Sequence, residues 1–81
     1  MQETPVRLDL RGLKCPLPAL KTRKALAGLA PGALLQVECT DPLAALDIPH
    51  LAQETGDALV SRSSQGELLV FVLRRMARRA P

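Results

Sequence analysis

The tetrapeptide Cys15-Pro16-Leu17-Pro18 is the feature that most restricts how this chain can fold. A proline lacks a backbone N–H and clashes with the preceding turn, so two prolines inside one helix normally break it. In the first turn of a helix this objection disappears, because the N–H groups there have no acceptor within the helix. The prolines therefore predict that a helix starts here, with Pro16 and Pro18 setting its start and Cys15 at the N-cap.

This first helix is expected to run from about residue 16 to residue 29, where Gly28 and the following Pro31-Gly32 pair stop it. A strand is predicted on each side of the helix. Residues 6–10 alternate between apolar and polar side chains, and so do residues 34–39, which is the period of a strand with one buried face.

A second helical region is predicted to begin at Asp41-Pro42 and to end at Gly56, which suits a left-handed C-cap position. We expect a break inside this region, with Asp47 as the N-cap of the continuation and Pro49 in its first turn. Asp41 is expected to cap the first part. Neither carboxylate is expected to have a catalytic role, because an acid beside a cysteine disfavours the thiolate.

The end of the chain predicts a hairpin, with strands at Ala58–Ser63 and Glu67–Arg74 joined by the Ser64-Gln65-Gly66 turn. The whole order is βαβαββ. This order predicts an α+β fold, a two-layer sandwich in which a mixed four-stranded sheet carries both helices on one face. We expect a single domain over residues 1–81, with a core at about 6–74 and a basic tail at 75–81.

Composition limits the class of protein further. A chain of 81 residues with one aromatic residue has room for a thin core and no internal chamber, so a separate nucleotide-binding domain does not fit. No apolar run has the roughly 18 residues that a membrane helix needs, and the start lacks the features of a signal peptide. We therefore expect a cytoplasmic protein that does not enter the membrane and whose cysteines stay reduced. The cysteine spacing matches no zinc or CxxC pattern, so no metal and no cofactor are expected.

Cys15 is the residue that the pattern marks for chemistry. A thiolate at a helix N-terminus faces free amide dipoles, which lower the pKa of a cysteine, and Arg11 and Lys14 are expected to stabilise the anion further. A fall of the pKa from about 8.5 to about 7 would make half of the thiol ionised at neutral pH. A persulfide anion would be stabilised in the same way. The alternative for Cys15 is a small buried apolar residue.

The second cysteine and the single histidine limit the reactions that can be assigned to this chain. Cys39 shares a strand face with Leu35 and Val37, which predicts a core thiol, and the alternative is a resolving cysteine that forms a disulfide with Cys15. The single histidine, His50, is expected to face solvent, and no Cys/His/Asn set supports a thiol hydrolase. Thiol–persulfide exchange suits a protein with one reactive thiol and no other catalytic group. Partner enzymes are then expected to activate the sulfur and to attach it to the final acceptor.

The stretch from Leu8 to Pro18, LDLRGLKCPLP, resembles the signature of the TusA-like (SirA-type) sulfur carrier proteins. Further matches are Pro31-Gly32, Asp41-Pro42, Asp47-Ile48-Pro49 and a last strand that ends at Arg74. The resemblance covers about residues 6–74. It implies that Cys15 carries sulfur as a persulfide, received from a cysteine desulfurase or rhodanese-type donor and passed to a downstream acceptor protein. The uses implied are tRNA thiolation, molybdenum cofactor metabolism or sulfur oxidation, and the protein is a shuttle rather than a stand-alone catalyst.

Ala19, Thr22, Leu26 and Leu29 are predicted to face the sheet, which leaves the opposite side of the first helix exposed. That side is either an ordinary solvated face or a docking surface for the partner proteins. The predicted docking residues are Leu17, Leu20, Lys21, Arg23 and Lys24.

The rival hypothesis is a small nucleic-acid-binding or regulatory module that uses this basic helix and the arginine-rich end of the chain. Direct nucleic-acid binding has little support, because only Phe71 could stack on a base and its mid-strand position predicts a core role. The terminal arginines are predicted to form a frayed solvated tail, with contact to phosphate or to an acidic partner as the alternative. They are Arg74, Arg75, Arg78 and Arg79.

Overall fold

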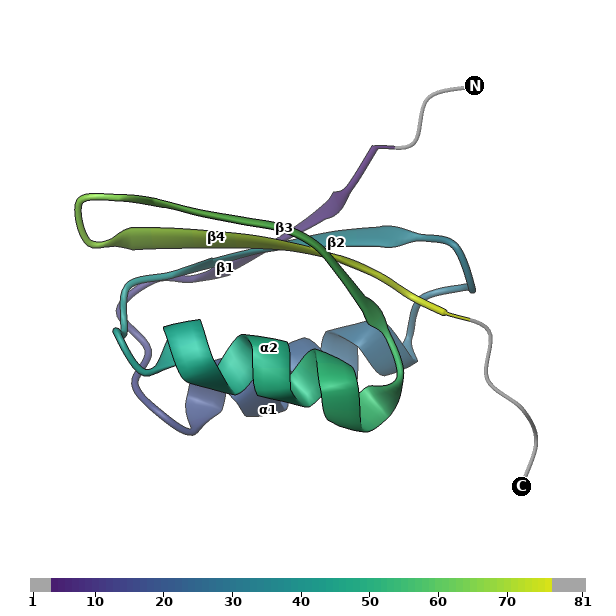
Figure 1. The fold of residues 1–81 in the computed structure, drawn as a ribbon, viewed down its shortest axis with the longest axis horizontal. Coiled ribbons are helices and arrows are strands. Elements are labelled where there is room, and N and C mark those ends of the chain that lie inside the picture. Colours follow the sequence, from purple (N-terminus) through teal and green to yellow (C-terminus); the bar gives the residue numbers. More distant parts are fainter. Residues whose placement is uncertain (1–3, 77–81) are drawn as a thin grey trace.

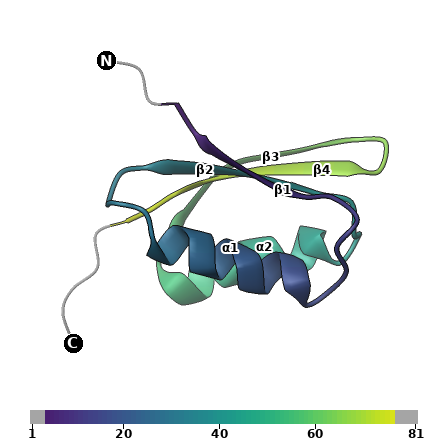
Figure 2. The same cartoon turned by 180° about the vertical axis from the view of Figure 1, so that it is seen from behind.

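The computed structural model describes residues 4–76, and its elements follow the predicted order βαβαββ. Figure 1 shows both helices on one face of the sheet, which confirms the two-layer α+β sandwich. Among the described residues, no element covers the opposite face of the sheet, as the view from behind also shows (Figure 2). The elements are β1 (Val6–Leu10), α1 (Leu17–Ala27), β2 (Leu34–Cys39), α2 (Ala44–Thr55), β3 (Ala58–Gln65) and β4 (Leu68–Arg74).

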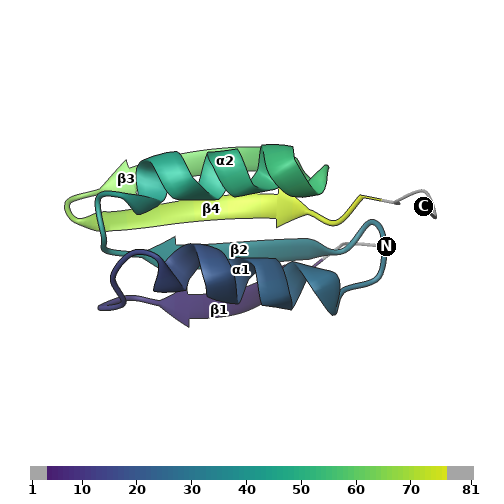
Figure 3. The same cartoon turned by 90° about the horizontal axis from the view of Figure 1, so that it is seen from below.

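The strands form one mixed sheet in the order β1-β2-β4-β3. β1 and β2 are parallel, with Leu8 opposite Val37, because α1 carries the chain back along the sheet between them. β4 pairs antiparallel with both β2 and β3. In Figure 3, α1 lies over β1 and β2, and α2 lies over β4 and β3. The hairpin turn sits at Gly66-Glu67, slightly beyond the predicted position, because β3 continues to Gln65.

The core lies between the sheet and the helices. In β2 the side chains of Leu35, Val37 and Cys39 are fully buried, as the alternation predicts, so Cys39 is confirmed as a core thiol. Phe71 lies opposite Val37 on β4 and is 2% exposed, so its predicted core role is also confirmed. The core therefore depends on the strand pattern rather than on aromatic side chains.

Helix α1 buries the side that faces the sheet. Thr22 and Leu26 are fully buried, as predicted, whereas Ala19 and Leu29 are only half-buried. Pro18 is also buried, so it packs under the helix in addition to lying at its start. The helix ends at Gly28, somewhat earlier than predicted.

The predicted break in the second helical region is wrong: α2 is continuous and Pro49 lies inside it. The helix already starts after the Asp41-Pro42 turn, so Asp47 is a first-turn residue rather than an N-cap. A proline inside a helix costs about 3 kcal/mol. Burial of Ile48 and Leu51 opposes this cost, at about 1.5–3 kcal/mol for each side chain. Gly56 ends the helix with a φ of 81°, which confirms the predicted left-handed C-cap.

The predicted solvated tail is wrong for Arg74 and Arg75. The N–H of Arg75 donates to the carbonyl of Ala33 at 2.8 Å, and the Arg75 carbonyl accepts from the N–H of Gly32 at 2.6 Å. The Arg74 guanidinium donates to the Gly32 carbonyl at 2.8 Å. Backbone pairing next to β2 thus continues to Arg75, one residue beyond the end of β4. Arg78 and Arg79 lie outside the described residues.

The polar group that fixes this end is Asp57, which is 6% exposed. One carboxylate oxygen accepts from the N–H of Met76 at 2.9 Å and the other from the hydroxyl of Thr55 at 2.8 Å. The guanidinium of Arg75 lies 3.9 Å from the second oxygen. The end of β4 is therefore bound to the end of α2.

Within residues 4–76, neither helix is long and apolar enough to cross a membrane.

Candidate functional site

Three connections meet at one end of the molecule (Figure 3): the β1–α1 loop, the β2–α2 loop and the β3–β4 turn. β1 and β2 are parallel, so their carboxyl ends reach the same edge of the sheet. Cys15 lies in the first of these connections and is exposed. The topology therefore presents this thiol next to residues that are distant in the sequence.

Cys15 does not occupy the N-cap that the sequence predicts. The N-cap is Pro16, Leu17 is the first helical residue and Pro18 follows it in the first turn. The peptide bond between Cys15 and Pro16 is cis. The carbonyl of Lys14 accepts the N–H of Leu17 at 2.9 Å, so a turn already precedes the helix. Cys15 is thus part of this turn, immediately outside the helix.

Two carboxylates from the other half of the chain hold Cys15. Its backbone N–H donates to Oδ2 of Asp41 at 2.6 Å, and its Sγ donates to Oδ2 of Asp47 at 3.2 Å. Asp41 also accepts the N–H of Leu43 at 3.1 Å, which fixes the β2–α2 loop. The sequence reasoning gave both aspartates capping roles and did not find these contacts, since they join residues 26 and 32 positions apart.

This arrangement reverses the predicted pKa shift of Cys15. The thiol donates to Asp47, is partly desolvated and lies near the negative charges of Asp47 and Asp41, all of which raise its pKa. A hydrogen bond from a thiol to a carboxylate stabilises the protonated form, because only that form can donate. The lowered pKa predicted from the helix terminus was therefore wrong. At neutral pH the unmodified cysteine is mainly the neutral thiol.

The two predicted anion-stabilising residues have other contacts. The Arg11 guanidinium bonds to both oxygens of Asp9, at 2.9 and 3.0 Å. Lys14 lies near Asp41, where its charge adds to the N–H bonds from Cys15 and Leu43 that lower the pKa of that carboxyl. Among the described residues, neither cation forms a hydrogen bond with the sulfur. Stabilisation of an anion by Arg11 or Lys14 stays a prediction.

The predicted docking residues are all exposed on α1, with Leu17 43% and Leu20 55% exposed. Arg23 also forms an ion pair of 3.1 Å with Glu54 on α2. The sequence reasoning missed two further leucines, Leu43 and Leu46, which are 50% and 72% exposed at the start of α2. They precede Asp47 closely, so exposed apolar side chains occur at the starts of both helices. The other two predicted docking residues, Lys21 and Lys24, are exposed as well.

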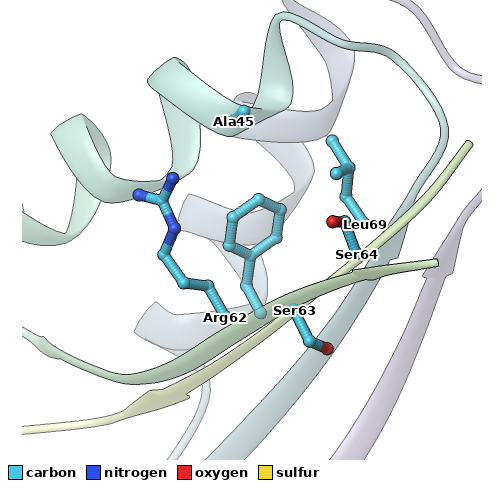
Figure 4. A pocket seen from close by; sticks show the side chains of 6 residues that line it. Ala45, Arg62, Ser63, Ser64 and Leu69 are labelled. Carbon is cyan, nitrogen blue, oxygen red and sulfur yellow. The ribbon is translucent and has the colours of Figure 1, made fainter. Parts of the chain in front are cut away.

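The hollows of the described surface are shallow and open. One of about 270 Å³ lies next to Cys15 and is lined by Gly12, Leu13, Lys14, Thr40, Asp41, Pro42 and Glu67. Another, of about 260 Å³, lies between α2 and β3, where Arg62 extends toward Ala45 (Figure 4). No cysteine, histidine or carboxylate lines this second hollow.

Neither cysteine forms a disulfide in the structure. Burial raises the pKa of the Cys39 thiol to about 11, so this thiol is a poor nucleophile at neutral pH. His50 is exposed, as predicted, and forms a contact of 3.4 Å with Glu54. Within residues 4–76, no group of three His, Cys, Asp or Glu side chains is placed to hold a metal ion. The reactive candidate is therefore Cys15.

Comparison with known proteins agrees with this fold. The family described as Sulfurtransferase TusA matches residues 6–75. The Sulfur carrier protein TusA of Allochromatium vinosum is 35% identical over 68 residues, which are 84% of this chain and 90% of that protein. YrkF of Bacillus subtilis is 33% identical over 75 residues, which are 93% of this chain, and the match spans 40% of the length of YrkF. The crystal structure of a SirA-like protein from Desulfitobacterium hafniense has the same fold, with a TM-score of 0.78 and 19% identity over 89% of this chain and 99% of that one.

Proposed function

The chain belongs to the TusA family of sulfur carrier proteins, and we therefore propose that Cys15 is the residue that carries the sulfur. A cysteine desulfurase or a rhodanese-type protein delivers the sulfur as a persulfide. A cysteine of a downstream acceptor protein then takes it. The acceptor protein passes the sulfur on to one of three pathways, which are tRNA thiolation, molybdenum cofactor metabolism and sulfur oxidation.

The chemistry is an exchange that needs no external oxidant. The sulfur of Cys15 attacks the outer sulfur of the donor persulfide and forms a new S–S bond. The old S–S bond breaks, the donor cysteine leaves as a thiolate, and the proton of the Cys15 thiol neutralises it. The second transfer repeats this step, with the acceptor cysteine as the nucleophile.

The observation that carries the proposal is the position of Cys15. It is exposed at the end of the molecule where the helices start, whereas the other thiol, that of Cys39, is fully buried. A carrier needs a thiol that enters the active site of a partner, and a loop at one end of a small domain meets this need. The exposed leucines of α1 and the adjacent cations provide a contact surface of mixed apolar and basic character.

The donor therefore needs an apolar patch with negative charges at its rim. On α1 this surface consists of Leu17, Leu20, Lys21, Arg23 and Lys24. Mixed surfaces of this kind suit transient complexes, in which charge guides the encounter and apolar contact fixes the orientation.

The test is the intact mass of the protein after incubation with a cysteine desulfurase, its pyridoxal phosphate and cysteine. We expect a gain of one sulfur atom that a reductant removes, that is absent in Cys15→Ser and that persists in Cys39→Ala. If no desulfurase or rhodanese donor adds sulfur while the protein binds RNA tightly and in a salt-sensitive way, the nucleic-acid hypothesis replaces this one. The structure gives that rival hypothesis little support, since Phe71 is buried and the backbone of Arg75 is hydrogen-bonded to Gly32 and Ala33.

A further inference from the structure

Asp47 is placed against the reacting sulfur by a rigid element. It lies in the first turn of α2, where its N–H donates to the carbonyl of Leu43 at 3.0 Å, and its neighbour Ile48 is fully buried in the core. Its Oδ2 lies 3.2 Å from the Sγ of Cys15 and accepts the thiol hydrogen. The carboxylate therefore has a fixed position relative to the thiol, and only a protonated sulfur can form this bond.

A loaded carrier presents a different group to the same carboxylate. A hydropersulfide is a stronger acid than the corresponding thiol, because its second sulfur weakens the S–H bond and spreads the negative charge. Near neutral pH the loaded cysteine is therefore mainly an anion. An anion has no hydrogen to donate to a carboxylate, and two negative charges at this distance repel each other.

We propose that Asp47 makes the reactivity of Cys15 depend on its load. In the free protein the carboxylate holds the empty thiol in its protonated, slowly reacting form, so loading requires the thiol to give its proton to the departing donor thiolate within the complex. Once the persulfide anion has formed, the carboxylate no longer bonds to the sulfur. This inference rests on the proposed function of Cys15. It assigns to Asp47 the role of making the empty and the loaded carrier differ in reactivity, whereas Cys15 carries the sulfur.

The charges around the thiol support this assignment. Asp41, on the β2–α2 loop, accepts the N–H of Cys15 and adds a second negative charge. On the cysteine's own loop, Lys14 faces Asp41, and Arg11 is paired with Asp9. The negative charges of Asp41 and Asp47 outweigh the positive charges of Lys14 and Arg11, since the pKa of Cys15 is raised. The empty thiol is thus protected from oxidation and from unwanted disulfides, which require the thiolate.

The experiment compares alkylation of the empty and loaded protein by iodoacetamide at neutral pH, with the site located by peptide mass. Inorganic polysulfide loads Cys15. We expect Asp47→Asn to alkylate about threefold faster or more when empty, because loss of the acceptor and of its negative charge lowers the pKa of the thiol and raises the fraction of thiolate. The loaded variant should react at the rate of the loaded wild type, because the persulfide is already ionised in both.

Glu54→Gln is the matched control, since it removes one negative charge from the same helix without touching Cys15. It should change neither rate. Equal acceleration of both forms in Asp47→Asn, or no acceleration of the empty form, overturns the inference but leaves Cys15 as the carrier. Failure of polysulfide and of every protein donor to load Cys15 overturns the proposed function and this inference with it.

The wild-type protein gives a second test that does not depend on how the variant folds. The alkylation rate of the empty protein, followed against pH, should reach half its maximum at a higher pH than for a short unstructured peptide with the sequence around Cys15. A midpoint at or below that of the peptide overturns the inference.

Discussion

The backbone N–H of Cys15 donates to the carboxylate of Asp41 at 2.6 Å, and this bond joins two loops whose residues are 26 positions apart. The same carboxylate accepts the N–H of Leu43 at 3.1 Å. Asp41 therefore supports the sulfur site and the start of α2 at once. Its removal has to affect both the position of Cys15 and the stability of the fold.

Asp41 is not the N-cap that the sequence predicts, since Leu43 holds that position. Asp41→Ala should still lower the midpoint of thermal unfolding by about 4–8 °C, because the loss of its hydrogen bonds costs about 1 kcal/mol in a domain of this size. Asp41→Asn keeps an oxygen acceptor and should lower it less. Circular dichroism melts of both variants measure the difference. If the two variants melted together with the wild type, the bond between the loops would have no structural importance.

A second prediction concerns the two cysteines. The pKa of Cys15 is raised by its contact with Asp47, and burial raises that of Cys39 to about 11. At neutral pH Cys15 should react slowly and Cys39 not at all in the folded state. In denaturant both should react at the rate of free cysteine. Alkylation followed by peptide mass spectrometry distinguishes the two sites, and rapid labelling of Cys39 in the native protein would contradict its burial.

A third prediction concerns docking. Leu20 is 55% exposed on α1, so Leu20→Asp should reduce the rate of sulfur transfer from a desulfurase by about tenfold or more while changing the thermal midpoint little. Leu26 on the opposite side of the helix is the control, since it is fully buried. Leu26→Ala should cost about 2–5 kcal/mol of stability. Normal sulfur transfer by the Leu20→Asp variant would show that partners bind elsewhere.

Acid should destabilise the protein through carboxylates paired in the folded state. Arg11 lowers the pKa of Asp9 from 3.8 to about 2, and the bonds from Arg7 and Gln36 lower that of Glu38. A lowered folded-state pKa gives stability that is present above the unfolded value and is lost as the pH falls. The free energy of unfolding in urea should therefore fall between about pH 4 and about pH 2. Glu38→Gln should make this fall shallower, and an unchanged slope would assign the loss to other groups.

A fifth prediction concerns the end of β4. Asp57 is buried and accepts bonds from Thr55 and Met76 beside Arg75. Asp57→Ala should destabilise the fold by about 3 kcal/mol, because it leaves the donors of Thr55 and Met76 without their acceptor and the largely buried cation of Arg75 without its counter-charge. Sulfur loading of the variant that remains folded should be normal, since Asp57 lies at the opposite end from Cys15. Chemical denaturation and intact mass measure the two effects.

The strands were predicted well, and the site was predicted less well. The alternation of residues 6–10 and 34–39 depends only on which side chains face the core, so their bounds match β1 and β2. The contacts of Asp41 and Asp47 with Cys15 come from the crossing of two loops, and no local pattern encodes them. The prediction for α2 failed for a related reason. Pro49 is a local signal for a break, but burial of Ile48 and Leu51 along one continuous face outweighs it.

The position of Asp47 in α2 also limits how the start of this helix can change. A helix turns by about 100° per residue. One residue inserted between Asp47 and Ile48, with the buried face kept in the core, would turn Asp47 by about that angle around the helix axis and away from Cys15. Such an insertion would leave the sandwich intact while it removed the bond to sulfur. The proposed role of Asp47 therefore constrains its spacing from the buried face of α2, whereas the length of the loop before Ala44 is free to vary.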